Sequence, residues 1–429
     1  MASSGPAPPS RPPGHGLGYL LLTLHLPSMA IGLGLGLTVP VIPELTQQMG
    51  IDLEGAALVF VFQLLGTFAA PLPTGFLIDK IGRRRVLLAG PIITGVASLL
   101  VAKVALDGAD GSFVELLIYR FIAGWGEQMW TMSRITVIAD TGASNQRGKQ
   151  VTQMFGVQQI GNLSGPIVGG FAAVLLGLWA PFVMHAAIVL LALIPSFYLL
   201  RETAPTAAAR QTSASGERPP GAWRQMTVAP IPAVFVVQFL ANVTRGGVFG
   251  GGVIVVYAAY AYGLEPDELG VLRGAMAAVA IPIVFTGGYV MDRFGRKYTI
   301  VPGLVLSSAS MVFLAGIAYM EASYAWFVAG FIAIHMSANI ISGNMQTLGT
   351  DVAPTVARGT FFGVSRTVAQ GGMVLSPASF GWLTALSGAT VGFGFLGATA
   401  FVGAVIVISL IPETLRREEP SRAASSTAG

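Results

Sequence analysis

Long apolar stretches recur along the 429-residue chain, and this recurrence restricts the possible folds more than any other feature. A helix of about 20 apolar residues spans the hydrocarbon core of a bilayer. Stretches of sufficient length lie at residues 18–43, 55–78, 86–106, 114–138, 150–176, 180–200, 228–261, 268–290, 298–319, 324–348, 360–386 and 391–411. We therefore expect an all-α membrane protein with twelve transmembrane helices, six before and six after a polar stretch.

The composition agrees with a membrane protein that crosses the bilayer many times. Charged residues make up 10% of the chain, whereas soluble domains contain about 25%. There is no cysteine, which excludes disulfides and cysteine-ligated metal. The expected domains are a disordered cytoplasmic tail at 1–16, a six-helix bundle at 17–200, a cytoplasmic linker at 201–226, a second six-helix bundle at 227–412 and a cytoplasmic tail at 413–429.

The basic residues predict the orientation. With the amino terminus in the cytoplasm, 18 of the 24 Lys and Arg residues fall on the cytoplasmic side, and Lys103 falls in or beside an outer loop. The acidic residues of the outer segments are Asp107, Asp110, Glu265, Asp267 and Glu268. Cytoplasmic loops of membrane proteins are enriched in Lys and Arg. We therefore expect a multi-pass protein of the cell membrane with both termini in the cytoplasm.

The two halves of the sequence repeat each other. The segment "GFLIDKIGRRR" (75–85) aligns with "GYVMDRFGRKY" (288–298) at an offset of 213 residues. At an offset of 211, the matching pairs include Asp140 with Asp351, Arg147 with Arg358, Gln159 with Gln370, Pro166 with Pro377 and Glu202 with Glu413. Because each half has six helices, both have the same orientation and form parallel repeats. Transporters built from such repeats hold the substrate between the halves and rock around it.

At these residues the sequence resembles the major facilitator superfamily over essentially its whole length. The loop pattern GxxxDxxGRR and its second copy are marks of that family, and "RFIAGWG" (120–126) resembles its fourth-helix motif RxxxGxG. The continuation "GWGEQ" resembles the GxGEA of spinster-like members, with Gln128 where alanine is usual. "GNLSGPIVGG" (161–170) resembles the fifth-helix signature of proton-driven exporters. The resemblance implies the major facilitator fold and a proton-coupled exporter similar to drug:proton antiporters.

The loop motif predicts a conformational latch on the cytoplasmic side. An acid at the end of a helix can accept hydrogen bonds from a neighbouring helix N-terminus or pair with an arginine, and a nearby glycine lets another helix approach. Such a contact would form in one rocking state and break in the other. The latch residues are Gly75, Asp79, Arg83, Gly288, Asp292 and Arg296. Alternatively, the basic residues here serve only topology.

The fifth-helix signature predicts close helix packing. Its residues are Gly161, Gly165, Pro166, Gly169 and Gly170. Three of these glycines recur every four residues on one face, so a partner helix can pack backbone to backbone there. The glycines carry no chemistry of their own, and the link to antiport comes from the resemblance alone. Ordinary helix packing is the alternative.

Three charges lie on one face of the expected fourth span. Arg120, Glu127 and Arg134 are seven residues apart, close to two helical turns. Apolar surroundings favour the neutral form of an acid and an arginine favours its charged form, so an acid between the two can load and release a proton. We therefore expect Glu127 and Arg120 to couple proton movement to transport. The alternatives are a fixed ion pair between Glu127 and an arginine of another helix, and an Arg134 side chain that extends to the interface.

The other charges within the expected spans are positive, at Arg245, Arg273 and Arg366. Five arginines against one acid favour an anionic or amphiphilic substrate over an organic cation. The residues expected to bind substrate are Arg134, Arg245, Trp130, Gln238, Asn242, Tyr257, Gln159 and Gln370. Alternatively, Arg273 and Arg366 face carbonyls or lipid headgroups, and the aromatic residues are packing or interfacial anchors.

Three histidines, His25, His185 and His335, also lie in expected spans. Histidine can shuttle protons, but a lone histidine is more often a hydrogen-bonded packing residue. No spacing suggests a metal site, no cofactor is expected, and no phosphate loop supports direct ATP drive.

The favoured interpretation is a secondary active transporter, not an enzyme, that exports a small organic or amphipathic molecule in exchange for protons. We expect it to act as a monomer in the lipid bilayer, with a small-molecule substrate and protons as partners and no nucleic acid. The alternatives are an organic-anion uptake symporter, an uncoupled facilitator, and a sensor or scaffold that kept the fold. The costly charges inside the membrane weigh against the last of these.

Overall fold

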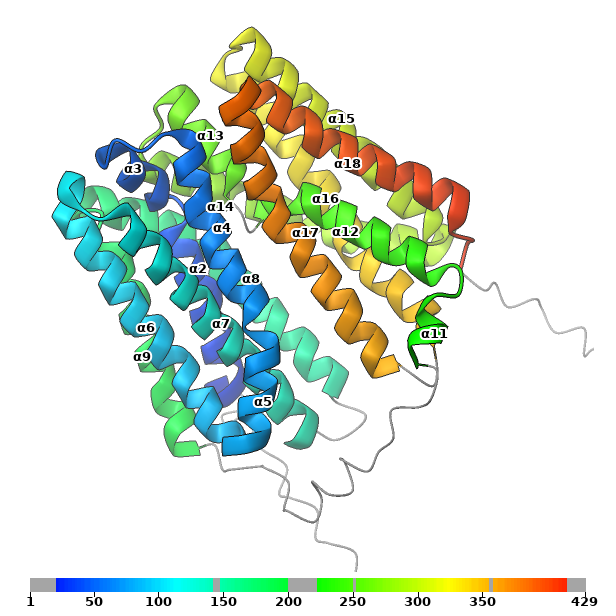
Figure 1. The fold of residues 1–429 in the computed structure, drawn as a ribbon, viewed down its shortest axis with the longest axis horizontal. Coiled ribbons are helices and arrows are strands. Elements are labelled where there is room, and N and C mark those ends of the chain that lie inside the picture. Colours follow the sequence, from blue (N-terminus) through cyan, green and yellow to red (C-terminus); the bar gives the residue numbers. More distant parts are fainter. Residues whose placement is uncertain (1–20, 142–146, 200–221, 250–251, 355–357, 415–429) are drawn as a thin grey trace, which may run out of the picture.

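The computed structural model describes residues 21–141, 147–199, 222–249, 252–354 and 358–414, and every regular element in these ranges is a helix (Figure 1). The first half contains η1 (Leu21–His25), α2 (Leu26–Thr38), α3 (Val41–Gln48), α4 (Leu53–Ala69), α5 (Pro71–Ile81), α6 (Arg83–Asp107), η2 (Gly108–Asp110), α7 (Phe113–Thr141), α8 (Arg147–Leu176) and α9 (Ala180–Leu199). The second half contains α11 (Ala222–Met226), α12 (Ile231–Phe249), α13 (Val253–Tyr262), α14 (Pro266–Phe294), α15 (Lys297–Met320), α16 (Tyr324–Val352), α17 (Arg358–Ser387) and α18 (Ala389–Leu410). The first tail and most of the expected linker and last tail lie outside the described residues, so the expected domain boundaries stay predictions.

The expected number of membrane passages is present. Nine helical segments in the described part of the chain are long and apolar enough to cross a membrane. The other three passages are α7, α14 and α17, with 29, 29 and 30 residues. The all-α fold with six passages in each half is therefore confirmed.

Three of the expected spans are broken, which their apolar character did not predict. The first divides into α2 and α3 at Pro40, and the second into α4 and α5 at Pro71, because proline lacks the amide hydrogen that continues a helix. The seventh divides into α12 and α13 beside Gly252, whose φ of +58° suits glycine. A Cβ atom added at Gly252 would lie 2.7 Å from Cε2 of Phe60 in the first half. The short helices α3 and α13 thus pack as separate units at the boundary between the halves.

The two halves use the same helix pairs. In the first half, α2 packs on α8, α4 on α7, α6 on α7 and α6 on α9. The corresponding pairs in the second half are α12 with α17, α14 with α16, α15 with α16 and α15 with α18. The repeat in the sequence is therefore also a repeat in packing.

Glycines bring α8 into backbone contact with α2. A Cβ atom added at Gly36 would lie 2.8 Å from the Cα atom of Gly165, closer than a real side chain allows. Gly161 and Gly169 contact the same helix, whereas Gly170 faces α14 of the opposite half. The signature of the fifth span thus borders both its own half and the other one.

The halves touch at one end and diverge at the other (Figure 1). They meet where α3 and α4 pack on α13, where α4 packs on α17 and where α8 packs on α14. The Tyr260 hydroxyl donates to the Ile51 carbonyl oxygen at 2.7 Å, and Gly381 lies beside Ala57. The halves diverge towards the end that carries α5 and α11. Because the predicted topology puts α3 and α13 outside, this arrangement is the one expected of an inward-facing state.

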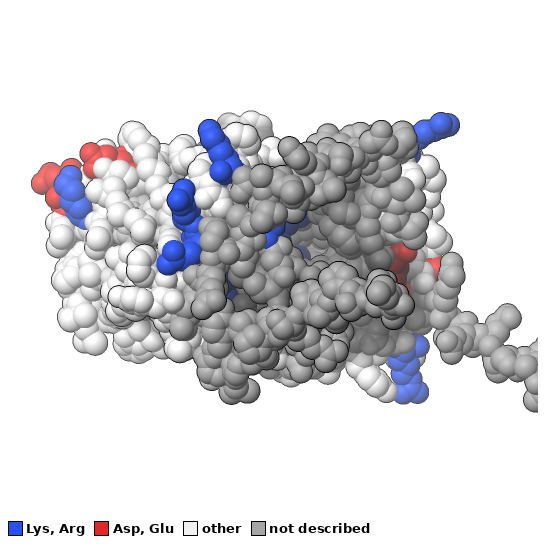
Figure 2. Space-filling view, turned by 90° about the horizontal axis from the view of Figure 1, so that it is seen from below, with Lys and Arg blue, Asp and Glu red and all other residues white. Residues whose placement is uncertain are grey.

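Figure 2 views the molecule from the end at which the halves diverge. Over the described part of this face, lysine and arginine side chains recur from one side to the other, and the acidic side chains appear in groups near the left edge and on the right. The distribution agrees with the predicted cytoplasmic side, and the orientation itself stays a prediction.

Candidate functional site

The charged stripe of the fourth span lies inside the first half. Arg120, Glu127 and Arg134 on α7 are each less than a tenth exposed. Their side chains reach residues of α2, α4 and α9. The bundle therefore surrounds the three charges with protein groups instead of lipid.

Arg120 binds two uncharged side chains. Its Nη1 donates to Thr38 Oγ1 at 3.3 Å, and its Nη2 donates to Gln63 Oε1. Arginine has donors only, so the Gln63 amide must turn its oxygen towards Arg120 and its NH2 group away. That NH2 group lies 3.3 Å from Glu127 Oε2 and donates to it. Gln63 thus connects the cation to the acid through one amide group.

The Glu127 carboxylate faces a histidine on its other side. His185 Nε2 on α9 lies 4.0 Å from Glu127 Oε1, with the two side chains 2% and 9% exposed. The Nδ1 atom of His185 lies 3.1 Å from Ser98 Oγ on α6. The helix α2 leaves space for the ring at Gly34, where an added Cβ would lie 3.2 Å from His185 Cγ. The acid therefore stands between an amide of α4 and an imidazole of α9.

Arg134 lies two turns further along α7. Its Nη2 donates to Ser28 Oγ on α2, and its Cζ lies 5.9 Å from the centroid of the Trp130 ring. Arg134 is 4% exposed, so its side chain is enclosed by the bundle. Trp130 is fully buried and packs against Leu87 and Ala30. In this conformation Trp130, which the sequence suggested as a substrate contact, is enclosed by the first half.

Sequence reasoning identified Arg120 and Glu127 but not the side chains that hold them. Thr38, Gln63 and Ser98 were missed, and His185 was interpreted as a packing residue. A signal existed, because Gln63 is an amide within an apolar stretch, where polar side chains are costly. The other partners can be recognised only when the helices are placed side by side.

Three expected substrate residues of the second half share one face of α12. Gln238 Oε1 accepts a hydrogen bond from Ser365 Oγ on α17 at 2.6 Å. Asn242 Nδ2 donates to the main-chain oxygen of Gln238 at 2.7 Å. The Cζ atom of Arg245 lies 5.2 Å from the centroid of the Phe249 ring. The structure therefore brings Asn242 onto Gln238, and helical spacing places Arg245 on the same face of α12.

The remaining expected substrate residues do not gather there. Tyr257 is buried in an aromatic cluster, with its ring centroid 5.1 Å from that of Phe393. Gln159 is exposed on α8 and accepts a hydrogen bond from Asn162 at 2.6 Å. Gln370 is half-buried on α17. In the described part of the chain, these residues and Trp130 form no hydrogen bond or ring contact with Gln238, Asn242 or Arg245.

Arg273 binds main-chain oxygens at the break in the seventh span. Its Nη1 donates to the Val248 carbonyl at 2.9 Å, and its Nη2 donates to the Phe249 carbonyl. The last carbonyls of a helix have no partner within it, so Arg273 stabilises the end of α12. This is the carbonyl contact given above as the alternative to a substrate role. Arg366 is exposed on α17.

The latch of the first half is described only in part. The side chains of Asp79 and Asp292 are not among those that the structure describes. A Cβ atom added at Gly75 would meet nothing within 4 Å. Among the residues that the structure describes, no helix makes the approach expected at Gly75 in this conformation, and the latch stays a prediction.

The second copy of the loop motif joins the ends of three helices. Arg296 Nε lies 3.1 Å from Asp351 Oδ2 at the end of α16. The Glu413 carboxylate, after α18, accepts hydrogen bonds at 2.9 Å from the main-chain N–H groups of Arg296 and Lys297. A carboxylate at a helix N-terminus is favourable because unpaired N–H groups point at it. These contacts fix α15, α16 and α18 to each other on the side that carries the loop.

The arrangement defines the class of the protein. Its long apolar helices are those of an integral membrane protein, and two parallel six-helix repeats around a buried polar network are the architecture of a transport protein. Among the described residues, no group of three or more His, Asp or Glu side chains could hold a metal ion.

The sequence model of the Major Facilitator Superfamily matches residues 25–250 and again residues 234–428, so the chain belongs to that family. Multidrug resistance protein 2 of Bacillus subtilis is 24% identical over 290 residues, which cover 65% of this chain and 70% of that protein. The class B tetracycline resistance protein of Escherichia coli is 25% identical over 288 residues, 66% of this chain and 69% of that one. The quinolone resistance protein NorA of Staphylococcus aureus is 29% identical over 183 residues, 42% of this chain and 45% of NorA.

Solved structures confirm the fold. A D-xylose-proton symporter matches with a TM-score of 0.73 at 17% identity, over 93% of this chain and 98% of that chain. A POT family transporter in complex with 5-aminolevulinic acid matches with a TM-score of 0.72 at 13% identity, over 92% of this chain and 95% of that chain. The spinster-like feature of the fourth span stays a resemblance.

Proposed function

We propose that the protein is a proton-coupled exporter of small organic or amphipathic molecules, and that Glu127 carries the coupling proton. The observation that supports this most is the position of Glu127, buried between Gln63 and His185 and linked to Arg120 through the Gln63 amide. Burial favours the neutral acid, and the arginine favours the carboxylate. A small change in the distances between these groups would load or release the proton.

The network links the protonation state of Glu127 to the boundary between the halves. Gln63 belongs to α4, which also packs on α17 of the second half. A protonated Glu127 offers an O–H donor where the carboxylate had only acceptors, so its contact with the Gln63 NH2 group weakens. The resulting shift of α4 would change its packing on α17.

Export is supported by two observations. Residues 161–170 match the exporter signature, and relatives of the chain are named as multidrug, tetracycline and quinolone resistance proteins. Uptake of an organic anion is the alternative, and the arginines of the spans favour it. In either case we place the substrate beside the face of α12 that carries Gln238, Asn242 and Arg245.

The test is transport by the purified protein in proteoliposomes. A tetracycline, a quinolone and an amphipathic carboxylate serve as probes, each with and without an imposed pH gradient. The proposal expects at least one probe to accumulate against its concentration gradient only when the pH gradient is present. Equal movement of every transported probe with and without the gradient would identify an uncoupled facilitator instead.

Glu127→Gln is the matched variant, because the amide keeps the shape and hydrogen-bonding capacity of the protonated acid. Accumulation driven by the pH gradient should disappear, while exchange of probe across the membrane survives. Thermal stability is measured on the same sample, since a purely structural acid predicts unfolding. A stable Glu127→Gln protein that still concentrates the probe with the wild-type pH profile contradicts the proposal.

We also propose a location in the cell membrane, with both termini and residues 201–226 in the cytoplasm, and a monomeric protein. The asymmetry of the basic residues supports this orientation. The cysteine-free chain allows a direct test with a single cysteine at Ser213. Labelling of that cysteine by an impermeant reagent outside intact cells would contradict the proposed orientation.

A further inference from the structure

We propose that His185 is the acceptor of the Glu127 proton, so that the two side chains share one proton inside the first half. This inference rests on the proposed coupling role of Glu127 and goes beyond it, because it names the second member of the proton site. His185 Nε2 and Glu127 Oε1 face each other at 4.0 Å. An approach of about 1 Å brings them to the usual hydrogen-bond distance.

The first argument concerns what a protonated Glu127 can bind. Its O–H group needs an acceptor, because a buried donor without one is costly. Gln63 presents its NH2 group to Glu127, since its oxygen is taken by Arg120. Thr131 Oγ1 donates to the main-chain oxygen of Glu127 and does not meet the carboxyl group. Among the described contacts of the Glu127 side chain, His185 Nε2 is the one that can accept.

The second argument concerns the orientation of the imidazole proton. A neutral histidine carries hydrogen on one ring nitrogen and a lone pair on the other. With hydrogen on Nδ1, His185 donates to Ser98 Oγ at 3.1 Å and turns its Nε2 lone pair towards Glu127. Ser98 keeps accepting this hydrogen bond after the ring is protonated. A hydroxyl can either accept from Nδ1–H or donate to Nδ1, so Ser98 permits the tautomer that can accept the Glu127 proton.

The surroundings of His185 contain few other charges. The helix α6 contributes Ser98, α2 contributes Gly34, and α7 contributes Glu127 and, further away, Arg120. Residues 150–176 of α8 include no ionisable side chain. The transfer breaks the O–H bond of Glu127 and forms an N–H bond at His185 Nε2, which leaves a carboxylate and an imidazolium with unchanged total charge. Because His185 Nε2 accepts a hydrogen bond from the protonated carboxyl group, the pair binds the proton more tightly than Glu127 does alone.

The test compares three substitutions. His185→Asn keeps a polar group near Ser98 but removes the nitrogen that faces Glu127. His185→Gln restores an acceptor near the Nε2 position without a basic nitrogen. His335→Asn is the matched control, because His335 is also a buried histidine but lies on α16, with its ring centroid 4.9 Å from that of Phe331. Two readouts are used, the pH profile of the pH-driven probe flux and the infrared band of the protonated Glu127 carboxyl group, assigned by its loss in Glu127→Gln.

We expect His185→Asn to move both pH midpoints down by about one pH unit, a tenfold loss of proton affinity. His185→Gln should move them less, and His335→Asn should not move them. Unchanged midpoints in a folded His185→Asn protein overturn the inference and leave the role of Glu127 intact. If the wild-type protein shows no titrating carboxyl band that disappears in Glu127→Gln, the proposed function is overturned as well.

Gly34→Ala keeps the test decisive if His185→Asn does not fold. The added methyl group would lie 2.5 Å from His185 Nε2, so the ring must leave the position at which Nε2 faces Glu127. The same downward shift of both midpoints is expected, although no ionisable group has been removed. If both pH midpoints of Gly34→Ala equal those of the wild-type protein, the proposal that Glu127 and His185 share a proton is contradicted.

Discussion

The two halves repeat each other in packing but not in what they bury. At the offset of 211 residues, the positions of Arg120, Glu127, Arg134 and His185 correspond to Phe331, Ala338, Met345 and Leu396. At the offset of 213, Gln63 corresponds to Met276. Each of these second-half residues is buried, and Phe331, Leu396 and Met276 belong to one apolar core. One helix arrangement therefore encloses a hydrogen-bonded charged network in one half and an apolar core in the other.

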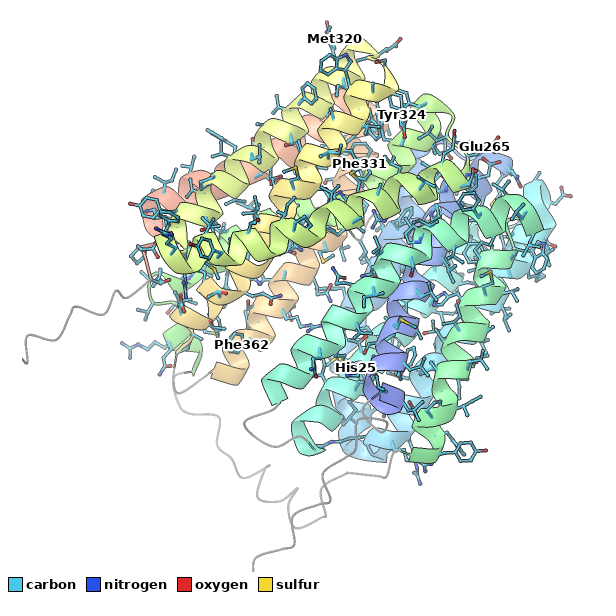
Figure 3. All side chains as sticks on the ribbon, turned by 180° about the vertical axis from the view of Figure 1, so that it is seen from behind. His25, Glu265, Met320, Tyr324, Phe331 and Phe362 are labelled. Carbon is cyan, nitrogen blue, oxygen red and sulfur yellow. The ribbon has the colours of Figure 1, made fainter. Side chains whose placement is uncertain are left out.

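This difference shows that the fold does not require the charges. Replacing a buried ion network by well-packed apolar side chains is often neutral or stabilising. The second half has such apolar side chains at the corresponding positions. Figure 3 shows Tyr324 and Phe331 on α16, in the part of the second half that holds the aromatic cluster. The charges of the first half are thus best explained by the proton chemistry proposed for them.

The largest expected loss of stability is in the second half. Phe331→Ala removes a fully buried ring whose centroid lies 5.9 Å from that of Phe327. We expect the free energy of unfolding to fall by about 3–5 kcal/mol, measured by thermal or denaturant unfolding in detergent. The folded fraction should keep the wild-type pH profile of transport. A shifted profile would show that the apolar half also takes part in proton coupling.

Gln63→Leu tests the link between the cation and the acid. The apolar side chain leaves buried donors of Arg120 without their acceptor, so we expect a loss of about 1–3 kcal/mol of stability and a changed pH profile. The matched control is Met276→Leu at the corresponding position, where a similar volume should cost less than about 1.5 kcal/mol and leave the profile unchanged. Equal effects of the two substitutions would remove the functional distinction between the halves.

The smallest expected loss of stability is at the loop motif, where the two halves should behave alike. Asp351→Asn removes the charge that faces Arg296, but the two side chains are 26% and 14% exposed. Partly exposed ion pairs contribute up to about 1 kcal/mol, so we expect a loss of that size in unfolding experiments. The sequence repeat predicts a similar loss for Asp140→Asn, at the corresponding position of the first half. A much larger loss of stability at one of the two positions would show that the two copies of the loop motif do not form equivalent contacts.

Much of the fold could be predicted from the sequence, because bilayer thickness sets the length of a span and the repeat sets the order of the helices. The breaks were missed because hydropathy averages over Pro40 and Pro71, although proline is itself a visible signal. The site was predicted only in part. Spacing placed Arg120 and Glu127 on one face, but their partners depend on how neighbouring helices are rotated and aligned along their axes. That alignment is decided by tertiary packing, such as the contact of Gly36 with Gly165.

The contact of Gly252 with the Phe60 ring has a consequence for the equilibrium between conformational states. The ring fits against this position because no side chain is present there, and it can do so only while the ends of the halves that carry α3 and α13 are together. Any substitution at Gly252 would penalise the closed state more than a state in which these ends are apart. A difference of about 1.4 kcal/mol changes the ratio of the two populations tenfold. A single methyl group at this position could thus supply a protein enriched in the opposite state for structural study.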